Sequence, residues 1–161
     1  MAEEFIEIYT DGASRGNPGP GGYGTILRFR GKEKELSEGF RKTTNNRMEL
    51  LAVIRGLEAL KTTQHPIKLY SDSKYVVDAI NLGWIYGWMK KQFKGKKNKD
   101  LWLKWFEVQR PFKIEYIWVK GHNGHDFNER CDQLAVNAAL GKNLQIDVVF
   151  EQEQQSDDLG L

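Results

Sequence analysis

The sequence predicts an α/β fold in which helices flank a mixed β-sheet. Three segments with the alternating apolar pattern of strands come before any helical pattern. Strand and helix patterns then alternate along the rest of the chain. Consecutive strands favour an antiparallel meander, and strand-helix alternation favours parallel strands joined by helical crossovers. We therefore expect a three-strand meander that is continued by parallel strands.

The three leading strands are predicted from composition and alternation. Residues 5–10 are β-branched and aromatic, and Asp11-Gly12 marks the end of the segment. Residues 23–30 alternate clearly, and residues 36–40 alternate more weakly after a short turn.

The next elements are a helix, a strand and a second helix. Apolar residues spaced by three and four positions between Leu50 and Leu60 predict a helix that starts near Asn46. Residues 67–70 form a short strand, and the two serines around Asp72 are typical of a helix start.

The C-terminal part is less regular. Residues 84–110 are helical in pattern at both ends and are interrupted by Gly87 and Gly95. Residues 114–119 alternate as a final strand, and a last helix is expected over about residues 128–140.

Length and composition indicate one domain. The chain has 161 residues, of which 40% are hydrophobic and 29% charged, so it can bury a single core. We expect this domain over residues 1–144. Residues 145–161 are expected to form a partly disordered tail, since the sequence is polar and acidic after Phe150.

Several classes of protein are disfavoured. No run approaches the ~20 apolar residues of a membrane span, and the N-terminus is acidic, so we expect a cytoplasmic monomer without membrane contact. Cys131 is the single cysteine, which excludes an internal disulfide and a multi-cysteine zinc site.

Four acidic residues are candidate metal ligands: Asp11, Glu49, Asp72 and Asp132. Each has an ordinary alternative role, in a turn, a capping box, a helix cap or a first helical turn. Two are predicted to end strands and two to open helices, and such positions converge at one edge of a sheet with parallel strands. Clustered carboxylates without cations destabilise a fold unless a positive ion binds, and an all-oxygen site suits Mg²⁺ or Mn²⁺.

The glycine-rich loop of residues 12–24 formally satisfies GxGxxG through Gly19, Gly21 and Gly24. We reject a dinucleotide site, because this loop leads into a strand rather than opening a helix. A close connection between two antiparallel strands is the better interpretation.

Two segments have the composition of a phosphate-binding surface. Residues 43–47 (TTNNR) combine hydroxyls, amides and a guanidinium at a predicted helix N-terminus, where backbone N–H groups attract anions. Helix capping is the simpler alternative, with Asn46 as the cap. Six lysines lie between Lys90 and Lys99 among aromatic residues, in a stretch too polar to be buried.

His122 and His125 lie in a loop with two glycines, between the last strand and the last helix. Such a histidine is usually just solvated. Near a metal cluster its pKa of ~6.5 would allow it to transfer a proton at neutral pH.

These features resemble type 1 ribonuclease H. The resemblance extends to about Leu140 and is carried by four motifs in the family's order: YTDGASRGNPGPGGYG, TTNNRMEL, SDSKYV and VKGHNGHDFNERCDQLA. It implies a five-stranded mixed sheet flanked by helices.

The resemblance also implies roles for single residues. Asp11, Glu49, Asp72 and Asp132 would be the catalytic, metal-binding acids, and His122 a mobile catalytic histidine, with His125 structural. Substrate-binding roles are implied or expected for seven further residues: Asn17, Thr44, Asn45, Asn46, Lys90, Lys91 and Lys94.

The expected reaction is hydrolysis of the RNA strand of an RNA/DNA hybrid, without sequence preference. Water attacks in line at the scissile phosphate with the help of two Mg²⁺ ions, or Mn²⁺ in their place, and leaves 5′-phosphate and 3′-hydroxyl ends. Two alternatives remain at this point. One is an exonuclease or integrase with the same sheet topology, and the other is a hybrid-binding module without catalysis.

Overall fold

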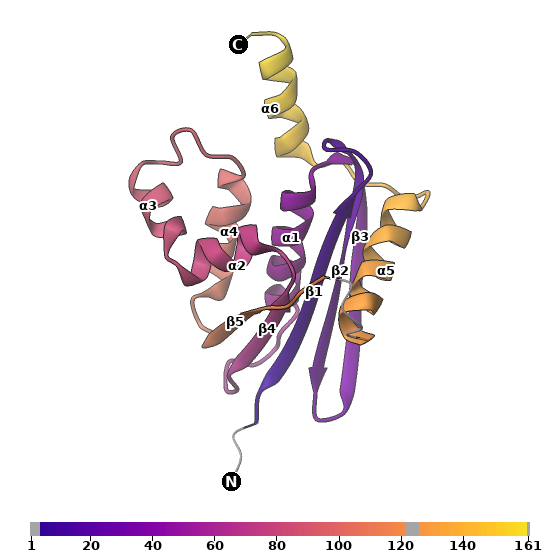
Figure 1. The fold of residues 1–161 in the computed structure, drawn as a ribbon, viewed down its shortest axis with the longest axis vertical. Helices are drawn as coiled ribbons and strands as arrows, with labels where there is room; N and C mark the ends of the chain where they lie inside the picture. The colour runs from indigo at the N-terminus through magenta and orange to yellow at the C-terminus, as the bar shows by residue number, and fades with distance from the viewer. Residues whose placement is uncertain (1–3, 122–125, 161) are drawn as a thin grey trace.

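A computed structural model describes residues 4–121 and 126–160 and has the expected mixed sheet (Figure 1). The strands are β1 (Ile6–Ser14), β2 (Gly19–Phe29), β3 (Lys32–Thr43), β4 (Ile67–Ser71) and β5 (Ile114–Trp118). The helices are α1 (Asn45–Glu58), α2 (Lys74–Asn81), α3 (Trp84–Lys90), α4 (Lys99–Gln109), α5 (Asp126–Leu140) and α6 (Val148–Asp158).

The strand order in the sheet is β3-β2-β1-β4-β5. β1, β2 and β3 pair antiparallel, and β4 runs parallel to both β1 and β5. The expected meander with parallel continuation is therefore confirmed. The paired part of β1 and β4 ends at Thr10 and Ser71, so Asp11 and Asp72 are the next residues of two adjacent parallel strands.

Helices cover both faces of this sheet because its central strands are apolar on both sides. Ile8 on β1 belongs to the main core, with the apolar residues of α1. Its neighbour Tyr9 points to the opposite face, where it lies with Ile26 and with Cys131 of α5. In Figure 1, α1 to α4 lie on one side of the sheet and α5 lies on the other.

The segment between β4 and β5 forms three helices that contribute to the main core. Trp102 and Trp105 of α4 are fully buried, and their indole N–H groups donate to the hydroxyls of Tyr75 and Tyr116 at 2.7 and 2.8 Å. Gly87 lies inside α3, so the predicted interruption at this position is wrong. The helical pattern is broken instead over residues 91–98, where Phe93 is buried and Asn98 has a positive φ.

The C-terminal segment differs from the expected disordered tail. Gln145 exchanges backbone hydrogen bonds with Gly39 and Arg41 at the edge of β3, and α6 follows. This helix projects beyond the rest of the molecule at the end where α1 begins (Figure 1). In the described part of the chain, no helix is long and apolar enough to cross a membrane.

Candidate active site

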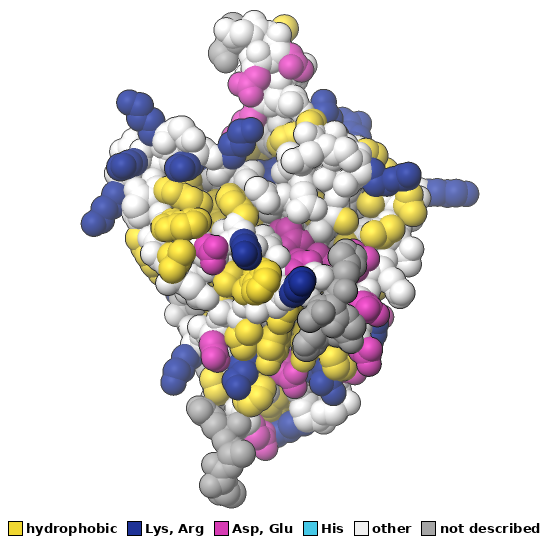
Figure 2. Space-filling model, viewed as in Figure 1, with side chains coloured by type: hydrophobic (Ala, Val, Ile, Leu, Met, Phe, Trp, Pro, Cys, Tyr) yellow, Lys and Arg dark blue, Asp and Glu magenta, His cyan; other side chains and the backbone are white. Residues whose placement is uncertain are grey.

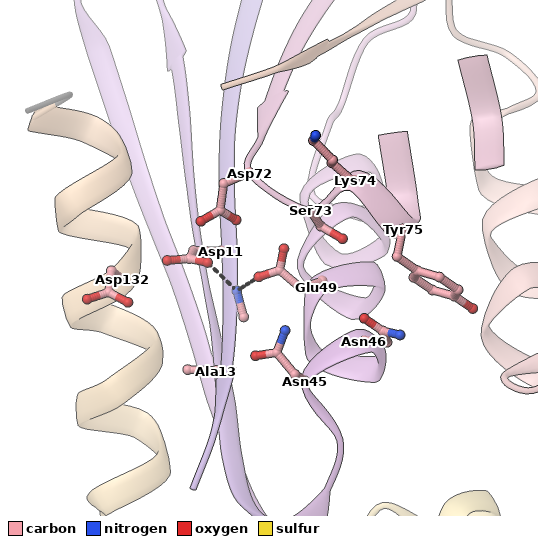
Figure 3. A pocket seen from close by; sticks show the side chains of 11 residues that line it. Asp11, Ala13, Asn45, Asn46, Glu49, Asp72, Ser73, Lys74, Tyr75 and Asp132 are labelled. Atoms are coloured by element: carbon pink, nitrogen blue, oxygen red, sulfur yellow. Dashed lines mark hydrogen bonds between the residues drawn. The ribbon is translucent and has the colours of Figure 1, made fainter. Parts of the chain in front are cut away.

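Three of the predicted acids meet at one point of the sheet. Oxygen atoms of Asp11, Glu49 and Asp72 all lie within 4.8 Å of one another. Asp11 lies on β1, Asp72 directly follows the adjacent strand β4, and Glu49 lies near the beginning of α1. Figure 3 shows their carboxylates pointing toward one another.

Asp132 approaches this group from the other face of the sheet. It lines the same open cavity, of about 440 Å³, as the other three acids. Its position depends on Gly24, which pairs with Asp11 in the register of β1 and β2. A Cβ at Gly24 would lie 2.3 Å from the Cys131 carbonyl oxygen, so only glycine lets α5 come this close.

The details of these positions differ from the sequence-based expectation in two respects. Asp11 does not end its strand, because β1 continues to Ser14 by pairing with the glycines of β2. Asp132 is the seventh residue of α5, which begins at Asp126, so it lies beyond the first turn.

Gly12 holds two of the carboxylates in place. Its backbone N–H donates to Asp11 Oδ1 at 2.9 Å and also to Glu49 Oε1. A Cβ at this position would lie 2.4 Å from the Glu49 nitrogen, which leaves no space for a side chain between β1 and α1. The sequence signal for this role is the Asp-Gly pair, which is equally typical of a turn.

The site is electrostatically strained without a cation. Burial and the neighbouring carboxylates hold the pKa of both Asp11 and Glu49 above the ordinary range of an acid. Among the residues that the structure describes, none of the four acids forms an ion pair with Lys or Arg. A hard divalent cation fits this all-carboxylate donor set. The geometry is therefore that of a divalent metal site.

Polar residues at the start of α1 border the acidic group. Asn45 and Asn46 are exposed and line the same cavity. The Asn45 N–H donates to Asn17 Oδ1 at 3.1 Å, which ties the loop after β1 to the helix start. The helix cap is Thr44, whose hydroxyl accepts from the Arg47 N–H at 3.3 Å, and not Asn46 as predicted.

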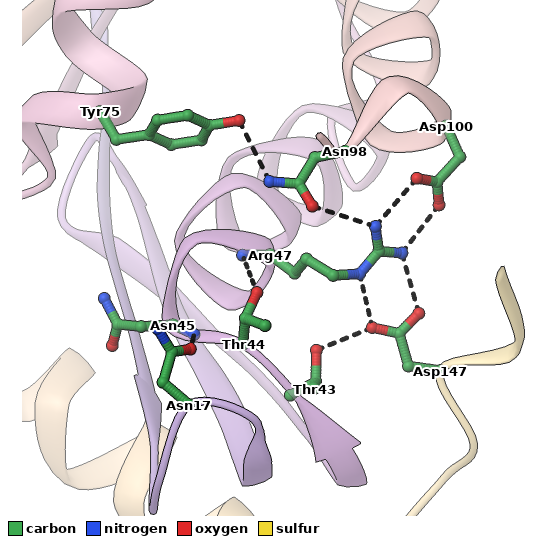
Figure 4. Close-up of polar contacts among 9 residues, drawn as sticks. All are labelled: Asn17, Thr43, Thr44, Asn45, Arg47, Tyr75, Asn98, Asp100 and Asp147. Carbon is green, nitrogen blue, oxygen red and sulfur yellow. Dashed lines mark hydrogen bonds and ion pairs between the residues drawn. The ribbon is translucent and has the colours of Figure 1, made fainter. Parts of the chain in front are cut away.

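Arg47 belongs to the segment that was expected to bind anions, but its side chain is buried. Its guanidinium contacts both oxygens of Asp100 at 2.7 and 2.9 Å and both oxygens of Asp147 at 2.7 and 2.8 Å (Figure 4). This ion-pair network joins α1 to α4 and to the C-terminal segment. No local pattern could reveal it, because its partners lie 53 and 100 positions away.

The remaining predicted residues lie apart from the acids or outside the described residues. Lys90, Lys91 and Lys94 are exposed at the end of α3 and in the loop that follows, away from the residues that line the acidic cavity. His122 and His125 fall in residues 122–125, which the structure does not describe.

Comparisons with known proteins agree with this geometry. The family model for RNase H matches residues 3–140. Ribonuclease H of Desulforamulus reducens is 53% identical over 148 residues, which cover 89% of this chain and 92% of that protein. Ribonuclease HI of Helicobacter pylori is 56% identical over 132 residues, which cover 81% and 90%.

Two solved structures are also similar. LC9-RNase H1, described as a type 1 RNase H with the type 2 active-site motif, is 31% identical with a TM-score of 0.78, covering 89% of this chain and 75% of its own. LC11-RNase H1, solved in complex with an RNA/DNA hybrid, is 28% identical with a TM-score of 0.64, covering 83% and 96%. The family model over residues 3–140 and relatives above 50% identity over most of the chain show that the chain belongs to the type 1 ribonuclease H family.

Proposed function

We propose that this protein hydrolyses the RNA strand of RNA/DNA hybrids and leaves 5′-phosphate and 3′-hydroxyl ends. The observation that carries the proposal is the convergence of Asp11, Glu49 and Asp72 within 4.8 Å, in a cavity that Asp132 also lines. Relatives above 50% identity are ribonucleases H, and a structural neighbour binds an RNA/DNA hybrid. An open, polar cavity at the protein surface is suited to a duplex rather than to a small ligand.

The four acids are proposed to hold two Mg²⁺ ions, for which Mn²⁺ can substitute. When bound, such ions supply an activated water and stabilise the leaving oxygen. The chain supplies orientation. The Gly12 N–H donates to the Glu49 carboxylate and orients it. Burial of Asp11 and Glu49 limits their contact with water, so water screens the attraction between their carboxylates and a bound cation only weakly.

Asn17, Thr44, Asn45 and Asn46 are proposed to hold the backbone of the hybrid beside the acids. The Asn17–Asn45 hydrogen bond and the Thr44 cap give this segment a fixed conformation before substrate arrives. Recognition of RNA requires contacts to 2′-hydroxyls across a wide, shallow minor groove, which polar side chains can make without reading the bases.

His122 is proposed to transfer a proton during turnover. The support comes from Gly121, the residue before it. A Cβ at Gly121 would lie 2.7 Å from Asp72 Oδ2, so the backbone at this point runs directly against one of the acids. A side chain with a pKa near neutrality is suited to proton transfer at such a site.

Lys90, Lys91 and Lys94 are proposed to bind phosphates at a distance from the cleavage point. All three are exposed, and no ion pair involves them among the described residues. Free surface lysines contribute affinity by releasing counterions from the duplex.

The organisation of the chain is proposed to be a catalytic domain over residues 1–144 followed by a C-terminal segment over residues 145–161. We also propose that the protein acts as a monomer in the cytoplasm. The cleavage site needs no residue from a second copy, since all four acids lie on one chain.

A cleavage assay tests the proposed function. Matched RNA/DNA, RNA/RNA and DNA/DNA duplexes are incubated with Mg²⁺ and with EDTA, and the products are separated on a gel. We expect cleavage of the RNA strand of the hybrid alone, only with Mg²⁺, and none by Asp11→Asn at saturating Mg²⁺. Equal cleavage of the three duplexes, or full activity of Asp11→Asn, would contradict the proposal.

A further inference from the structure

The acidic helix α6 is held in a defined place beside α1. Asp147, the residue before the helix, accepts hydrogen bonds from the Thr43 hydroxyl at 2.7 Å and from the buried guanidinium of Arg47. One turn later, both oxygens of Glu151 contact Arg41 at 2.8 and 2.9 Å. These contacts fix the start of α6 against the end of β3 and the beginning of α1. Figure 4 shows the contacts of Asp147, and Figure 1 shows where α6 lies.

A narrow cleft of about 220 Å³ separates α6 from residues that are proposed to hold the nucleic-acid backbone. One wall contains Asn17, Thr44 and Asn46. The opposite wall belongs to α6 and includes Glu153 and Asp157, which are four positions apart and therefore share a face of the helix.

The charge on this cleft is unfavourable for a polyanion. Glu153 and Asp157 are exposed, and neither forms an ion pair within the described part of the chain. The wall that contains Asn17, Thr44 and Asn46 offers neutral amides and a hydroxyl. Among the described residues that line the cleft, Lys97 is the one cation. A phosphate backbone at this wall therefore faces two carboxylates across a short distance. Figure 2 shows acidic side chains on the projecting helix and lysines and arginines on the neighbouring surfaces.

We propose that Glu153 and Asp157 weaken hybrid binding by repelling the backbone held at Asn17, Thr44 and Asn46. The two acids lie outside the cavity of the catalytic carboxylates, so they affect affinity for the hybrid and take no part in the chemistry. The inference rests on the proposed function, because it concerns the same substrate. Its physical basis is that each carboxylate beside a phosphate offsets part of the favourable effect of one nearby lysine.

The test compares two neighbouring aspartates of α6. Asp157→Asn removes a charge from the cleft. Asp158→Asn removes the same charge from a different face of the helix, where Asp158 lines a separate hollow with Arg41 and Lys42. A third variant combines Glu153→Gln with Asp157→Asn. All three side chains are exposed, so the fold should be unaffected.

The dissociation constant for an RNA/DNA hybrid is measured in EDTA at several salt concentrations. At low salt we expect tighter binding by about three- to tenfold for the double variant, a smaller gain for Asp157→Asn, and parental affinity for Asp158→Asn. The gain should disappear near 1 M salt, where the Debye length is about 3 Å.

Two outcomes would overturn the inference. Equal gains for Asp157→Asn and Asp158→Asn would mean that total charge, and not the cleft, sets the affinity. Parental affinity of the double variant would mean that the backbone does not pass α6. The parent protein tests the proposed function separately, since failure to bind or cleave the hybrid would appear before any variant is compared.

Discussion

Neutralising Asp11 should stabilise the metal-free protein although it abolishes activity. Asp11→Asn keeps the size of the side chain and an oxygen that can accept from the Gly12 N–H. It removes one charge from a group whose oxygens lie within 4.8 Å of each other. We therefore expect a higher melting temperature than that of the parent in EDTA.

The magnitude follows from the distances. Two ionised carboxylates 4.8 Å apart repel each other by about 3.5 kcal/mol at an effective dielectric constant of about 20. Proton uptake by Asp11 and Glu49 and the open side of the cavity reduce this cost. A net gain of about 1 to 3 kcal/mol corresponds to roughly 3 to 10 °C for a chain of this size.

The effect should depend on pH with a definite sign. The folded-state pKa of Asp11 and of Glu49 is raised, so the parent is relatively stable below the unfolded-state pKa of about 4. That stability is lost as the pH rises through the folded-state pKa. The advantage of Asp11→Asn should accordingly be small at pH 5 and large at pH 8.5.

Thermal melts in EDTA at these two pH values decide the matter, with Glu107→Gln as a control. Glu107 is an exposed carboxylate of α4 without an ion pair among the described residues, and its loss should change the melting temperature by no more than about 2 °C. If Asp11→Asn melts lower than the parent at pH 8.5, the acids do not repel one another and the electrostatic account is wrong. Added Mg²⁺ should reverse the order, since only the parent retains all ligands.

Three further predictions concern other parts of the molecule. His122→Ala should lower kcat by roughly 100-fold or more with little change in KM, and a change confined to KM in steady-state kinetics would exclude proton transfer. Replacing Lys90, Lys91 and Lys94 by Ala should make the slope of log affinity against log salt less steep, by about 0.9 for each phosphate that the protein no longer neutralises. Binding titrations at several salt concentrations measure this slope. An unchanged slope would exclude the role in phosphate binding. Arg47→Met should lower the free energy of unfolding, measured by urea titration, by about 3 to 5 kcal/mol, because it leaves Asp100 and Asp147 without their cation. A decrease below about 1 kcal/mol would mean that these ion pairs are not truly buried.

Local patterns were enough to predict the five strands and the candidate acids. Composition identified β1, and alternation identified β2, β3 and β5. Apolar spacing identified α1. Such signals depend only on the residues of one segment and on which of them face the core. Strand ends were less predictable. Asp11-Gly12 has the composition of a turn, yet β1 continues to Ser14, because backbone pairing with β2 depends on a partner strand rather than on local preference.

The sequence by itself therefore determined the fold class and the four candidate acids. Only the tertiary structure decided how α5 brings Asp132 to that site, which requires the close approach at Gly24. The tertiary structure also decided the role of Arg47, which could have faced a phosphate but is buried in ion pairs with aspartates 53 and 100 positions away. One of these aspartates, Asp147, fixes the start of α6. The physical reason is that periodicity reports the environment of one segment. Ion pairs and close helix packing depend instead on which distant segments the fold brings together.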